Sequence, residues 1–355
     1  MRVIIPYYNV DEIDFYYHLI ESLHKFSKHS VSIVYVTGEA KDKTYSRFSF
    51  HKLNVLKSKK VLQPFLHGED ICKQIKGVSG DVMFIVSDLW ALNLARLCFR
   101  KIGIPYVVWI RGDHRRVRKL RGANLFKRIF CNYLEIKCLN SAAFVIPNCM
   151  SLFNKLPKWG VKRGKITEPI HNGVDCGFFK PLNISRSSKF TVGFAGRICP
   201  EKRIVEFLRI AKDLKSQGID FIIAGKKEME ITFPENVRYL GRLPFFEMPK
   251  FYNMIDLLVL PSATEGFPSA ILEAYACEKP VLVSREAFPK ELKIFGAVSD
   301  INEFKGEILK LKQDNLKEIG KEARKYVLQN FSWKRFADNI AFYLEKAIKL
   351  YNIGK

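Results

Sequence analysis

The segment Leu257-Leu-Val-Leu-Pro-Ser-Ala-Thr-Glu265-Gly266-Phe-Pro268-Ser-Ala-Ile-Leu-Glu273-Ala274 indicates a strand followed by a loop and a helix. Its first four residues form an apolar run, typical of a strand that is buried on both faces of a parallel sheet. Gly266 allows a tight turn, and Pro268 suits the first position of a helix, where its missing N–H costs nothing. We therefore expect Glu265 in the loop at the carboxyl end of the strand and Glu273 in the opening turns of the helix.

Short apolar runs alternate with helix-length segments along the whole chain, which is typical of a parallel sheet with helices on both faces. In the first half we expect strands at Val3–Pro6, Val31–Val36, Val82–Val86, Tyr106–Ile110 and Phe144–Ile146, and helices at Glu12–Ser27, Leu89–Ile102 and Asn124–Asn140. In the second half we expect further strands at Phe190–Phe194, Phe221–Ala224, Val237–Leu240 and Val281–Val283, and helices at Glu201–Gln217, Leu316–Gln329 and Trp333–Tyr351.

A polar, serine-rich segment at Pro181–Lys189 interrupts this alternation and is typical of a linker between domains. We therefore predict an α/β protein with two Rossmann-like domains whose parallel sheets face a central cleft, where ligands bind in such folds. The expected boundaries are 1–180 for the first domain, 181–332 for the second, and 333–355 for a C-terminal helix that packs back on the first.

Charge is the unusual feature of the composition, because 59 Lys and Arg against 36 Asp and Glu give the 355-residue chain a net charge of +23. Such an excess implies an anionic partner, whether nucleic acid, a membrane surface or a phosphorylated small molecule. No apolar run is long enough for a secretory signal or a membrane span, and the 8 cysteines show no metal-ligand spacing. We therefore expect a soluble cytoplasmic protein with reduced thiols.

A second glycine-containing turn follows the strand expected at Phe190–Phe194, in the segment Gly193-Phe-Ala-Gly196-Arg197-Ile-Cys-Pro-Glu-Lys202. Arg197 and Lys202 flank this turn and could converge on one diphosphate, with charge-assisted hydrogen bonds worth about 1.5–3 kcal/mol each. The alternative is that both are solvated surface charges.

Glu265 and Glu273 also have two interpretations. Carboxylates beside the unpaired N–H groups of a helix start can accept the hydroxyls of a sugar or a ribose, or they can simply be favourable charges near a helix N-terminus. A third segment, His171-Asn172-Gly-Val-Asp175, marks a tight turn just before the linker. That turn either closes a domain or contributes to the cleft.

In combination these segments carry a family resemblance. The matching text, in chain order, is His171-Asn-Gly-Val-Asp175, Phe179-Lys-Pro181, Gly193–Arg197, Glu201-Lys202, Val237-Arg-Tyr-Leu-Gly241, Pro261–Ala274, Pro280-Val281 and Phe331-Ser-Trp333. With it the chain resembles the retaining group 1 (family 4) glycosyltransferases of the GT-B fold, which include bacterial lipid, lipopolysaccharide and capsule mannosyl- and glucosyltransferases. The resemblance covers the second domain densely and the first from about Asp81 onward.

The resemblance implies transfer of a hexose from a UDP- or GDP-sugar to a glycan or lipid-linked acceptor in the synthesis of cell-surface polysaccharide or glycoconjugate. It also implies retention of the anomeric configuration, an acceptor-binding first domain, a donor-binding second domain, and no metal or other cofactor. The residues to which it gives a catalytic role are Arg197 and Lys202, on the diphosphate, and Glu265, on the hydroxyls of the transferred sugar. The further donor-binding residues it implies are Gly196, Arg242, Gly266, Phe267, Pro268 and Glu273, the last of them on the ribose diol.

The chain departs from the family pattern at three places. Pro6-Tyr-Tyr-Asn9 stands where many relatives have a glycine-rich loop, and Glu278 stands where glycine is common. Arg111 occupies a position that is often histidine; arginine cannot act as a base at neutral pH, but it could bind a phosphate or an anionic acceptor. The candidate acceptor or sugar contacts are Arg111, Asp113, His114 and Asn172.

The excess positive charge is concentrated in Arg115-Arg-Val-Arg-Lys-Leu-Arg121 and Lys127-Arg128. We expect these cations to face an anionic membrane surface. Apolar residues recur just downstream at helical spacing, and we expect them to pack into the core of the first domain: Phe126, Ile129, Phe130, Tyr133 and Leu134.

Two rival functions remain. One is a nucleotide-sugar epimerase or an inactive sugar-binding relative of the same fold, and the other is a basic nucleic-acid-binding protein. The cation runs lack interleaved aromatic residues, so no nucleic-acid partner is expected.

Overall fold

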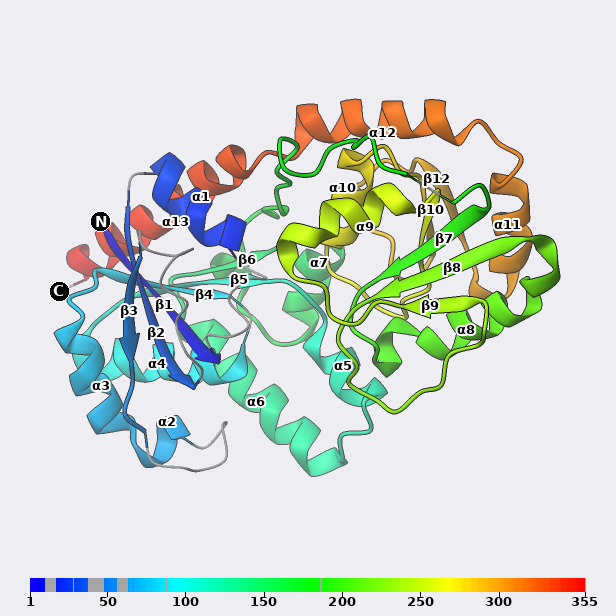
Figure 1. The fold of residues 1–355 in the computed structure, drawn as a ribbon. Coiled ribbons are helices and arrows are strands. Elements are labelled where there is room, and N and C mark those ends of the chain that lie inside the picture. The colour runs from blue at the N-terminus through cyan, green and yellow to red at the C-terminus, as the bar shows by residue number, and fades with distance from the viewer. Residues whose placement is uncertain are drawn as a thin grey trace. The chain divides into compact units, whose positions relative to one another are not determined.

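The computed structural model describes residues 1–9, 17–27, 29–37, 48–55, 63–86, 88–185 and 187–354. The chain forms two compact units, drawn together in Figure 1. Unit 1 contains Met1–Gly112, Asn124–His171 and Trp333–Lys355, and unit 2 contains Asp113–Ala123 and Asn172–Ser332. This division differs from the sequence-based boundaries in two respects: the second unit starts at Asn172, and it includes a short segment from the first half of the chain.

Unit 1 is built on a six-stranded parallel sheet with the order β3-β2-β1-β4-β5-β6. The strands are β1 (Arg2–Asn9), β2 (Ser30–Thr37), β3 (Ser49–Lys52), β4 (Val82–Val86), β5 (Tyr106–Ile110) and β6 (Phe144–Pro147). Its helices are α1 (Tyr17–Ser27), α2 (Gln63–Leu66), α3 (Gly68–Gly77), α4 (Leu89–Ile102), α6 (Leu125–Ser141), α7 (Met150–Lys158), the 3-10 turn η3 (Arg163–Lys165) and α13 (Trp333–Ile353). Every residue of β4 and β5 is buried, as expected for strands that are covered on both faces.

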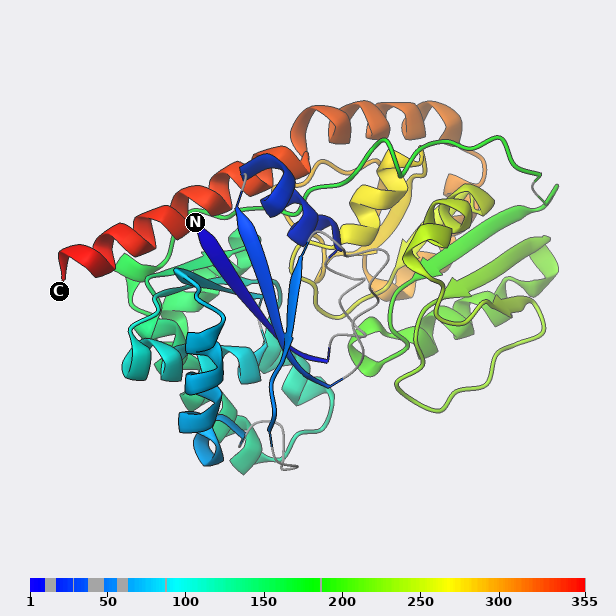
Figure 2. The ribbon, with the colours of Figure 1, turned by 60° about the vertical axis from the view of Figure 1, so that its left-hand side comes forward.

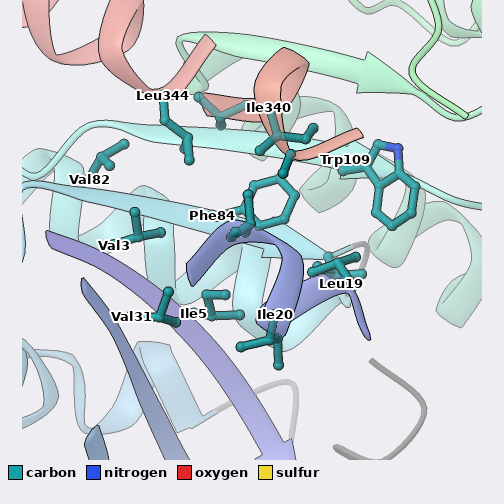
Figure 3. Close-up of a cluster of buried hydrophobic side chains, with 14 of the residues drawn as sticks. Val3, Ile5, Leu19, Ile20, Val31, Val82, Phe84, Trp109, Ile340 and Leu344 are labelled. Carbon is teal, nitrogen blue, oxygen red and sulfur yellow. The ribbon is translucent and has the colours of Figure 1, made fainter. Parts of the chain in front are cut away.

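The C-terminal helix α13 contributes to the core of unit 1 rather than to that of unit 2. It packs against α1, β4 and β5, and the red and blue helices lie side by side in both views (Figure 1, Figure 2). Figure 3 shows Ile340 and Leu344 of this helix meeting Phe84 and Trp109 of the sheet. The Trp109 indole also donates a hydrogen bond to the Ile170 carbonyl oxygen at 2.9 Å, which satisfies its buried N–H.

Unit 2 repeats the architecture with a parallel sheet of order β12-β11-β10-β7-β8-β9. The strands are β7 (Phe190–Ala195), β8 (Ile219–Ala224), β9 (Val237–Tyr239), β10 (Leu257–Leu260), β11 (Val281–Ser284) and β12 (Gly296–Ser299). The helices are α5 (His114–Leu120), α8 (Ile204–Asp213), α9 (Met248–Met254), α10 (Ser269–Ala276), α11 (Phe304–Leu311) and α12 (Leu316–Asn330), with 3-10 turns η4 (Pro200–Lys202), η5 (Lys215–Gln217), η6 (Phe245–Glu247) and η7 (Ile301–Glu303). The predicted α/β fold with two parallel sheets is confirmed.

The order of the strands changes direction between β7 and β10. Strands β7, β8 and β9 follow one another toward one edge, while β10, β11 and β12 follow one another toward the opposite edge. Such a switch point leaves a crevice at the carboxyl ends of the two central strands, where ligands bind in open α/β sheets. The two motifs singled out in the sequence, around Arg197 and around Glu265, follow these two strands directly.

Glu278 adopts a backbone conformation that explains why glycine is common at this position in the family. Its φ is +59°, in the left-handed region that a residue with a side chain rarely enters. The following Lys279 N–H donates to the Ala274 carbonyl at 2.8 Å, so this residue ends α10 in the manner of a helix C-cap. Pro6–Asn9, by contrast, are the last residues of β1. Residues 10–16, which include the first five residues of the helix expected at Glu12–Ser27, lie outside the described residues.

The expectation that the apolar stripe of α6 packs into the core is wrong for most of its residues. Leu134 is buried, but Phe126 is 86% exposed, Ile129 and Tyr133 are each 59% exposed, and Phe130 is 45% exposed. The helix packs on unit 1 through a different face, made of Cys131, Leu134, Glu135, Cys138 and Leu139. The exposed apolar residues lie in Leu125–Tyr133, whereas the buried face begins at Cys131, and periodicity alone could not show which residues are buried. Among the described residues, no helix is both long enough and apolar enough to cross a bilayer.

Candidate functional site in unit 2

Two glycines bring the segments after β7 and β8 close together. The Gly196 N–H donates to the Ala224 carbonyl at 3.0 Å, and the Gly225 N–H donates to the Gly241 carbonyl at 2.8 Å. A Cβ added to Gly225 would lie 1.7 Å from the Gly196 carbonyl oxygen, so only glycine fits at this contact. The turn after β7, which carries Arg197, is therefore fixed against the loop after β8.

Lys202 and Glu265 form an ion pair across the switch point. The Lys202 ammonium donates to Oε1 of Glu265, and the Ser262 hydroxyl donates to the same oxygen at 2.7 Å. The two side chains are only 18% and 12% exposed, so the pair is far less screened than a surface salt bridge. Since Lys202 Cε would lie 3.9 Å from a Cβ at Gly196, the lysine side chain passes beside the turn that carries Arg197. The structure thus brings the two predicted motifs together.

Arg197 lies between two carboxylates. Its Nη2 donates to Oε1 of Glu201 at 3.1 Å, and its Nη1 donates to Oε2 of Glu228 at 3.2 Å. Glu201 is 2% exposed, while the side chain of Glu228 is 24% exposed. Burial alone would raise the pKa of Glu201, but hydrogen bonds, chiefly from Arg121, outweigh it and hold that pKa below its ordinary value. Burial and the neighbouring Glu201 raise the pKa of the Cys199 thiol to about 11.

Arg121 is a member of this cluster that sequence reasoning assigned to a basic surface run instead. Its Nε donates to both carboxylate oxygens of Glu201, at 3.0 and 3.1 Å, and its Nη2 donates to Oε2 of Glu228 at 2.8 Å. Arg121 directly follows α5 in the segment Asp113–Ala123, and α5 packs against η4. Glu201 lies 80 residues further along the chain, and a local sequence pattern cannot predict a contact over that separation.

Asn172 holds the loop that carries Glu265. Its amide donates to the Phe267 carbonyl and to the Ser269 hydroxyl, both at 2.8 Å, and the side chain is 2% exposed. The predicted donor-binding residues Gly266, Phe267 and Pro268 are all buried, and the helix starts at Ser269, one residue later than predicted. The structure therefore gives Asn172 a place beneath the loop.

The remaining donor-binding candidates lie on neighbouring elements of the same unit. Glu273 lies in the second turn of α10, half-buried, and accepts a hydrogen bond from the Tyr252 hydroxyl at 2.6 Å. Burial, and to a lesser extent Glu273, raises the pKa of Tyr252 well above its ordinary value, so the tyrosine remains a donor. Arg242 is exposed and follows Gly241, whose φ is +75° and whose carbonyl binds the loop after β8.

The candidate acceptor contacts are divided between the units. Arg111 follows β5 in unit 1, and its guanidinium lies 5.1 Å from the centre of the Trp109 ring. Asp113 and His114 belong to unit 2, where the Asp113 carboxylate caps α5 by accepting from the Arg116 N–H at 2.9 Å. That capping bond accounts for Asp113 locally.

Metal-ligating side chains do not gather in the described part of the chain, since no group of three or more His, Cys, Asp or Glu there could hold an ion. All eight cysteines are free thiols, and only Cys176 is not fully buried.

Comparison with known proteins shows which family the sequence around this site resembles. Residues 179–326 match the family described as glycosyl transferases group 1. A probable sucrose-phosphate synthase of Thermosipho melanesiensis is 29% identical over 195 residues, which is 49% of this chain and 46% of that protein. The N,N'-diacetylbacillosaminyl-diphospho-undecaprenol alpha-1,3-N-acetylgalactosaminyltransferase of Campylobacter jejuni is 34% identical over 113 residues, 30% of this chain and 29% of that protein. The chain thus covers half or less of the length of these two curated relatives.

Solved structures extend the similarity to both units. The sucrose-phosphate synthase of Thermosynechococcus elongatus has a TM-score of 0.81 at 14% identity, covering 99% of this chain and 100% of that one. The Anabaena protein HepE in complex with UDP-glucose has a TM-score of 0.76 at 16% identity, covering 98% of this chain and 100% of that one. Residues 179–326 therefore carry the sequence pattern of the group 1 glycosyltransferases, and both units share the GT-B fold of these solved structures.

Proposed function

We propose that this protein is a retaining, family 4 glycosyltransferase that moves a hexose from a UDP- or GDP-sugar to a glycan or lipid-linked acceptor. The observation that carries the proposal is the Lys202–Glu265 pair beside the Arg197 turn at the switch point of unit 2. One cation and one carboxylate, both largely buried, match a donor that has an anionic diphosphate on one side of its anomeric carbon and hydroxyls on the other.

The roles of the residues follow from their chemistry. Arg197 and Lys202 would bind the diphosphate and stabilise the negative charge that grows on it as the bond to the anomeric carbon breaks. Glu265 would accept hydrogen bonds from the sugar hydroxyls, and Glu273 would accept them from the ribose. In a retaining transfer the acceptor oxygen bonds to the same face of the anomeric carbon, and its proton passes to the departing phosphate oxygen.

The two cations also bear on the question of a cofactor. Charge on the leaving diphosphate can be balanced either by a divalent ion or by cationic side chains. We propose that Arg197 and Lys202 supply this balance and that the enzyme needs no metal. Activity that survives EDTA treatment would support this, and activity restored only by added Mg²⁺ or Mn²⁺ would refute it.

The donor class can be tested by thermal unfolding with UDP, GDP, ADP and CMP. A ligand at about a hundred times its dissociation constant stabilises the fold by about 2.7 kcal/mol. We expect one nucleoside diphosphate to raise the unfolding midpoint, and the double variant Arg197→Ala, Lys202→Ala to abolish this shift.

The reaction is then tested by analysing the products formed from the matching nucleotide sugar, with and without acceptor extract. An epimerised sugar nucleotide formed without acceptor would indicate an epimerase instead, and an inverted linkage would refute retention.

We also propose that the protein works at the inner, anionic face of a membrane, in the synthesis of cell-surface polysaccharide or glycoconjugate. The Campylobacter jejuni relative is named for an acceptor that carries a diphospho-undecaprenol group. On this chain, the solvent-facing side of the first turns of α6 carries five exposed apolar side chains: Leu125, Phe126, Ile129, Phe130 and Tyr133. We call this set the α6 apolar face.

Charge complementarity favours a bilayer as the occupant of this face. The same helix carries the cations Lys127, Arg128 and Lys137, in a chain with a net charge of +23. Each Lys or Arg near an anionic leaflet adds about 1 kcal/mol, and apolar side chains add the energy of their burial. In this arrangement the α6 apolar face would contact the acyl region of the bilayer, and the neighbouring cations would contact its anionic headgroups.

Flotation with liposomes tests this placement. We expect binding to vesicles of phosphatidylglycerol at low salt, weak binding to phosphatidylcholine, and loss of binding in Phe126→Ser with Phe130→Ser. Phe246→Ser is the matched control, because Phe246 is 71% exposed but lies on η6 in unit 2. If the wild type binds neither kind of vesicle, this proposal fails. It also fails if the wild type is a dimer that the same double variant converts into a monomer, because the α6 apolar face then has a protein occupant.

A further inference from the structure

Four charged side chains form a closed cluster beside the proposed donor site: Arg121, Arg197, Glu201 and Glu228. Each arginine donates to both carboxylates, and each carboxylate accepts from both arginines. The four formal charges cancel, so the cluster is complete without any bound anion. Arg197, the residue proposed to hold the donor diphosphate, is therefore already occupied by two carboxylates before a donor arrives.

The two carboxylates differ in how firmly they are held. Glu201 is 2% exposed and is engaged by both Nε and Nη2 of Arg121 as well as by Nη2 of Arg197. Removing such a buried, paired carboxylate from its partners is costly. Glu228 has a side chain that is 24% exposed. It accepts one bond from Nη2 of Arg121, at 2.8 Å, and its contacts to Arg197, at the longer distances of 3.2 and 3.4 Å, are made by Nη1 alone. Glu228 is therefore the partner that an incoming anion can replace.

The backbone around Glu228 supports an exchange that involves only its side chain. Its N–H donates to the Ile198 carbonyl at 3.0 Å, and the Ile198 N–H donates to the Lys226 carbonyl at 2.9 Å. These bonds fix the loop after β8 against the turn after β7. An exchange at Arg197 therefore requires a new position of the Glu228 side chain only, and it leaves these backbone bonds intact.

We propose that Glu228 occupies the Nη1 group of Arg197 until a donor diphosphate replaces it, and that Arg121 positions Arg197 by holding Glu201. This inference rests on the proposed function, because it concerns the same diphosphate site. Glu228 then acts as an internal competitor that lowers affinity for the donor diphosphate, whereas Arg121 acts as a positioning residue that does not touch the donor.

The two residues have opposite expected effects. Glu228→Gln keeps the size and one acceptor of the side chain but removes a negative charge beside the diphosphate, so affinity should rise about three- to tenfold, a range typical of one partly screened charge. Arg121→Met leaves buried Glu201 to pair with Arg197 alone. Arg197 is then drawn toward Glu201, and affinity should fall about tenfold, with partial recovery in Arg121→Lys.

The experiment is calorimetric titration of these variants with the nucleoside diphosphate that stabilises the wild type most. Glu286→Gln is the matched control, because Glu286 also lies between two arginines of unit 2, with Arg203 at 2.5 Å and Arg116 at 3.8 Å. It removes the same charge outside the cluster and should leave affinity unchanged. Titration with the corresponding nucleoside, which lacks phosphate, should show no difference between Glu228→Gln and the wild type.

Kinetics separate positioning from a merely structural role. We expect Glu228→Gln to lower KM for the donor, and Arg121→Met to raise it, with smaller changes in kcat. If the wild type binds no nucleoside diphosphate, the proposed function itself fails. If the wild type binds one but Glu228→Gln binds it equally or more weakly, or Glu286→Gln tightens binding as much, the role of Glu228 is refuted. If Arg121→Met lowers only the unfolding midpoint and leaves KM unchanged, Arg121 is structural and its positioning role is refuted.

Discussion

Replacing Asn172 with alanine tests whether this residue positions the loop that carries Glu265. The substitution removes two buried hydrogen bonds of 2.8 Å, to the Phe267 carbonyl and the Ser269 hydroxyl. Bonds of this kind contribute about 0.5–1.5 kcal/mol each, so the loss is about 2 kcal/mol. For a domain of this size that corresponds to a fall of roughly 4–8 °C in the unfolding midpoint. Because the lost contacts lie under the loop, the stabilisation by a nucleoside diphosphate should fall as well.

The assay is differential scanning fluorimetry with and without the nucleoside diphosphate that stabilises the wild type. Asn253→Ala is the matched control, since the Asn253 amide also donates to two carbonyls, of Lys180 and Pro249, at 2.9 and 2.8 Å, and is 3% exposed. Because the Asn253 side chain also accepts from the Leu182 N–H at 2.8 Å, this control should lose at least as much stability, and it should keep the ligand shift. If Asn172→Ala unfolds at the wild-type temperature, or if it keeps the full ligand shift as the control does, Asn172 does not position the loop.

Three further outcomes follow from contacts in unit 2. Lys202→Met removes the cation that pairs with Glu265, at a site where the two side chains are only 12–18% exposed. Urea unfolding should show that the free energy of unfolding falls by about 1.5–3 kcal/mol, and an unchanged urea midpoint would contradict the pairing. The pKa of Glu201 in the folded protein is lowered from its ordinary value of 4.5. The ionised carboxylate therefore contributes stability above pH 4.5, and this contribution is lost as the pH falls through the lower pKa of the folded state. Glu201→Gln should make stability depend less on pH in the acid range, and equal pH dependence of the variant and the wild type would refute this. Gly225→Ala places a Cβ 1.7 Å from the Gly196 carbonyl oxygen. This variant should lose about 1–3 kcal/mol of unfolding free energy and show no stabilisation by nucleotide. A stable variant that still binds nucleotide would show that the turn after β7 can move to accommodate the methyl group.

Most of the fold could be predicted from the sequence because the strands of a parallel sheet are continuous apolar runs. Tyr106–Ile110 and Leu257–Leu260 were predicted with the observed bounds, and both are buried along their whole length. The missed strands are β3 and β12, which lie at the edges of the two sheets. Edge strands pair on one side only and need no long apolar run, so Ser-Phe-His-Lys and Gly-Ala-Val-Ser left no recognisable pattern.

The site was predictable only where its residues lie in one local segment. The turn with Arg197 and Lys202 and the loop with Glu265 each follow a strand, and the parallel topology brings the ends of those strands together. Arg121 and Glu228 were missed because their contacts join residues 31 to 107 positions apart. A single sequence shows that such residues are charged, but their pairing depends on where the tertiary fold places them.

The α6 helix shows the converse problem, in which a strong local pattern predicts the wrong surroundings. Helical periodicity identifies an apolar face, but the energy gained depends on what covers that face. Here Leu134 and its neighbours already bury one face against unit 1, so Phe126 and Phe130, which are 86% and 45% exposed, add little to the stability of the fold. Exposed apolar side chains clustered on one face promote non-specific association. Their presence beside cations on the same helix is therefore better explained by a surface that covers them during function than by folding.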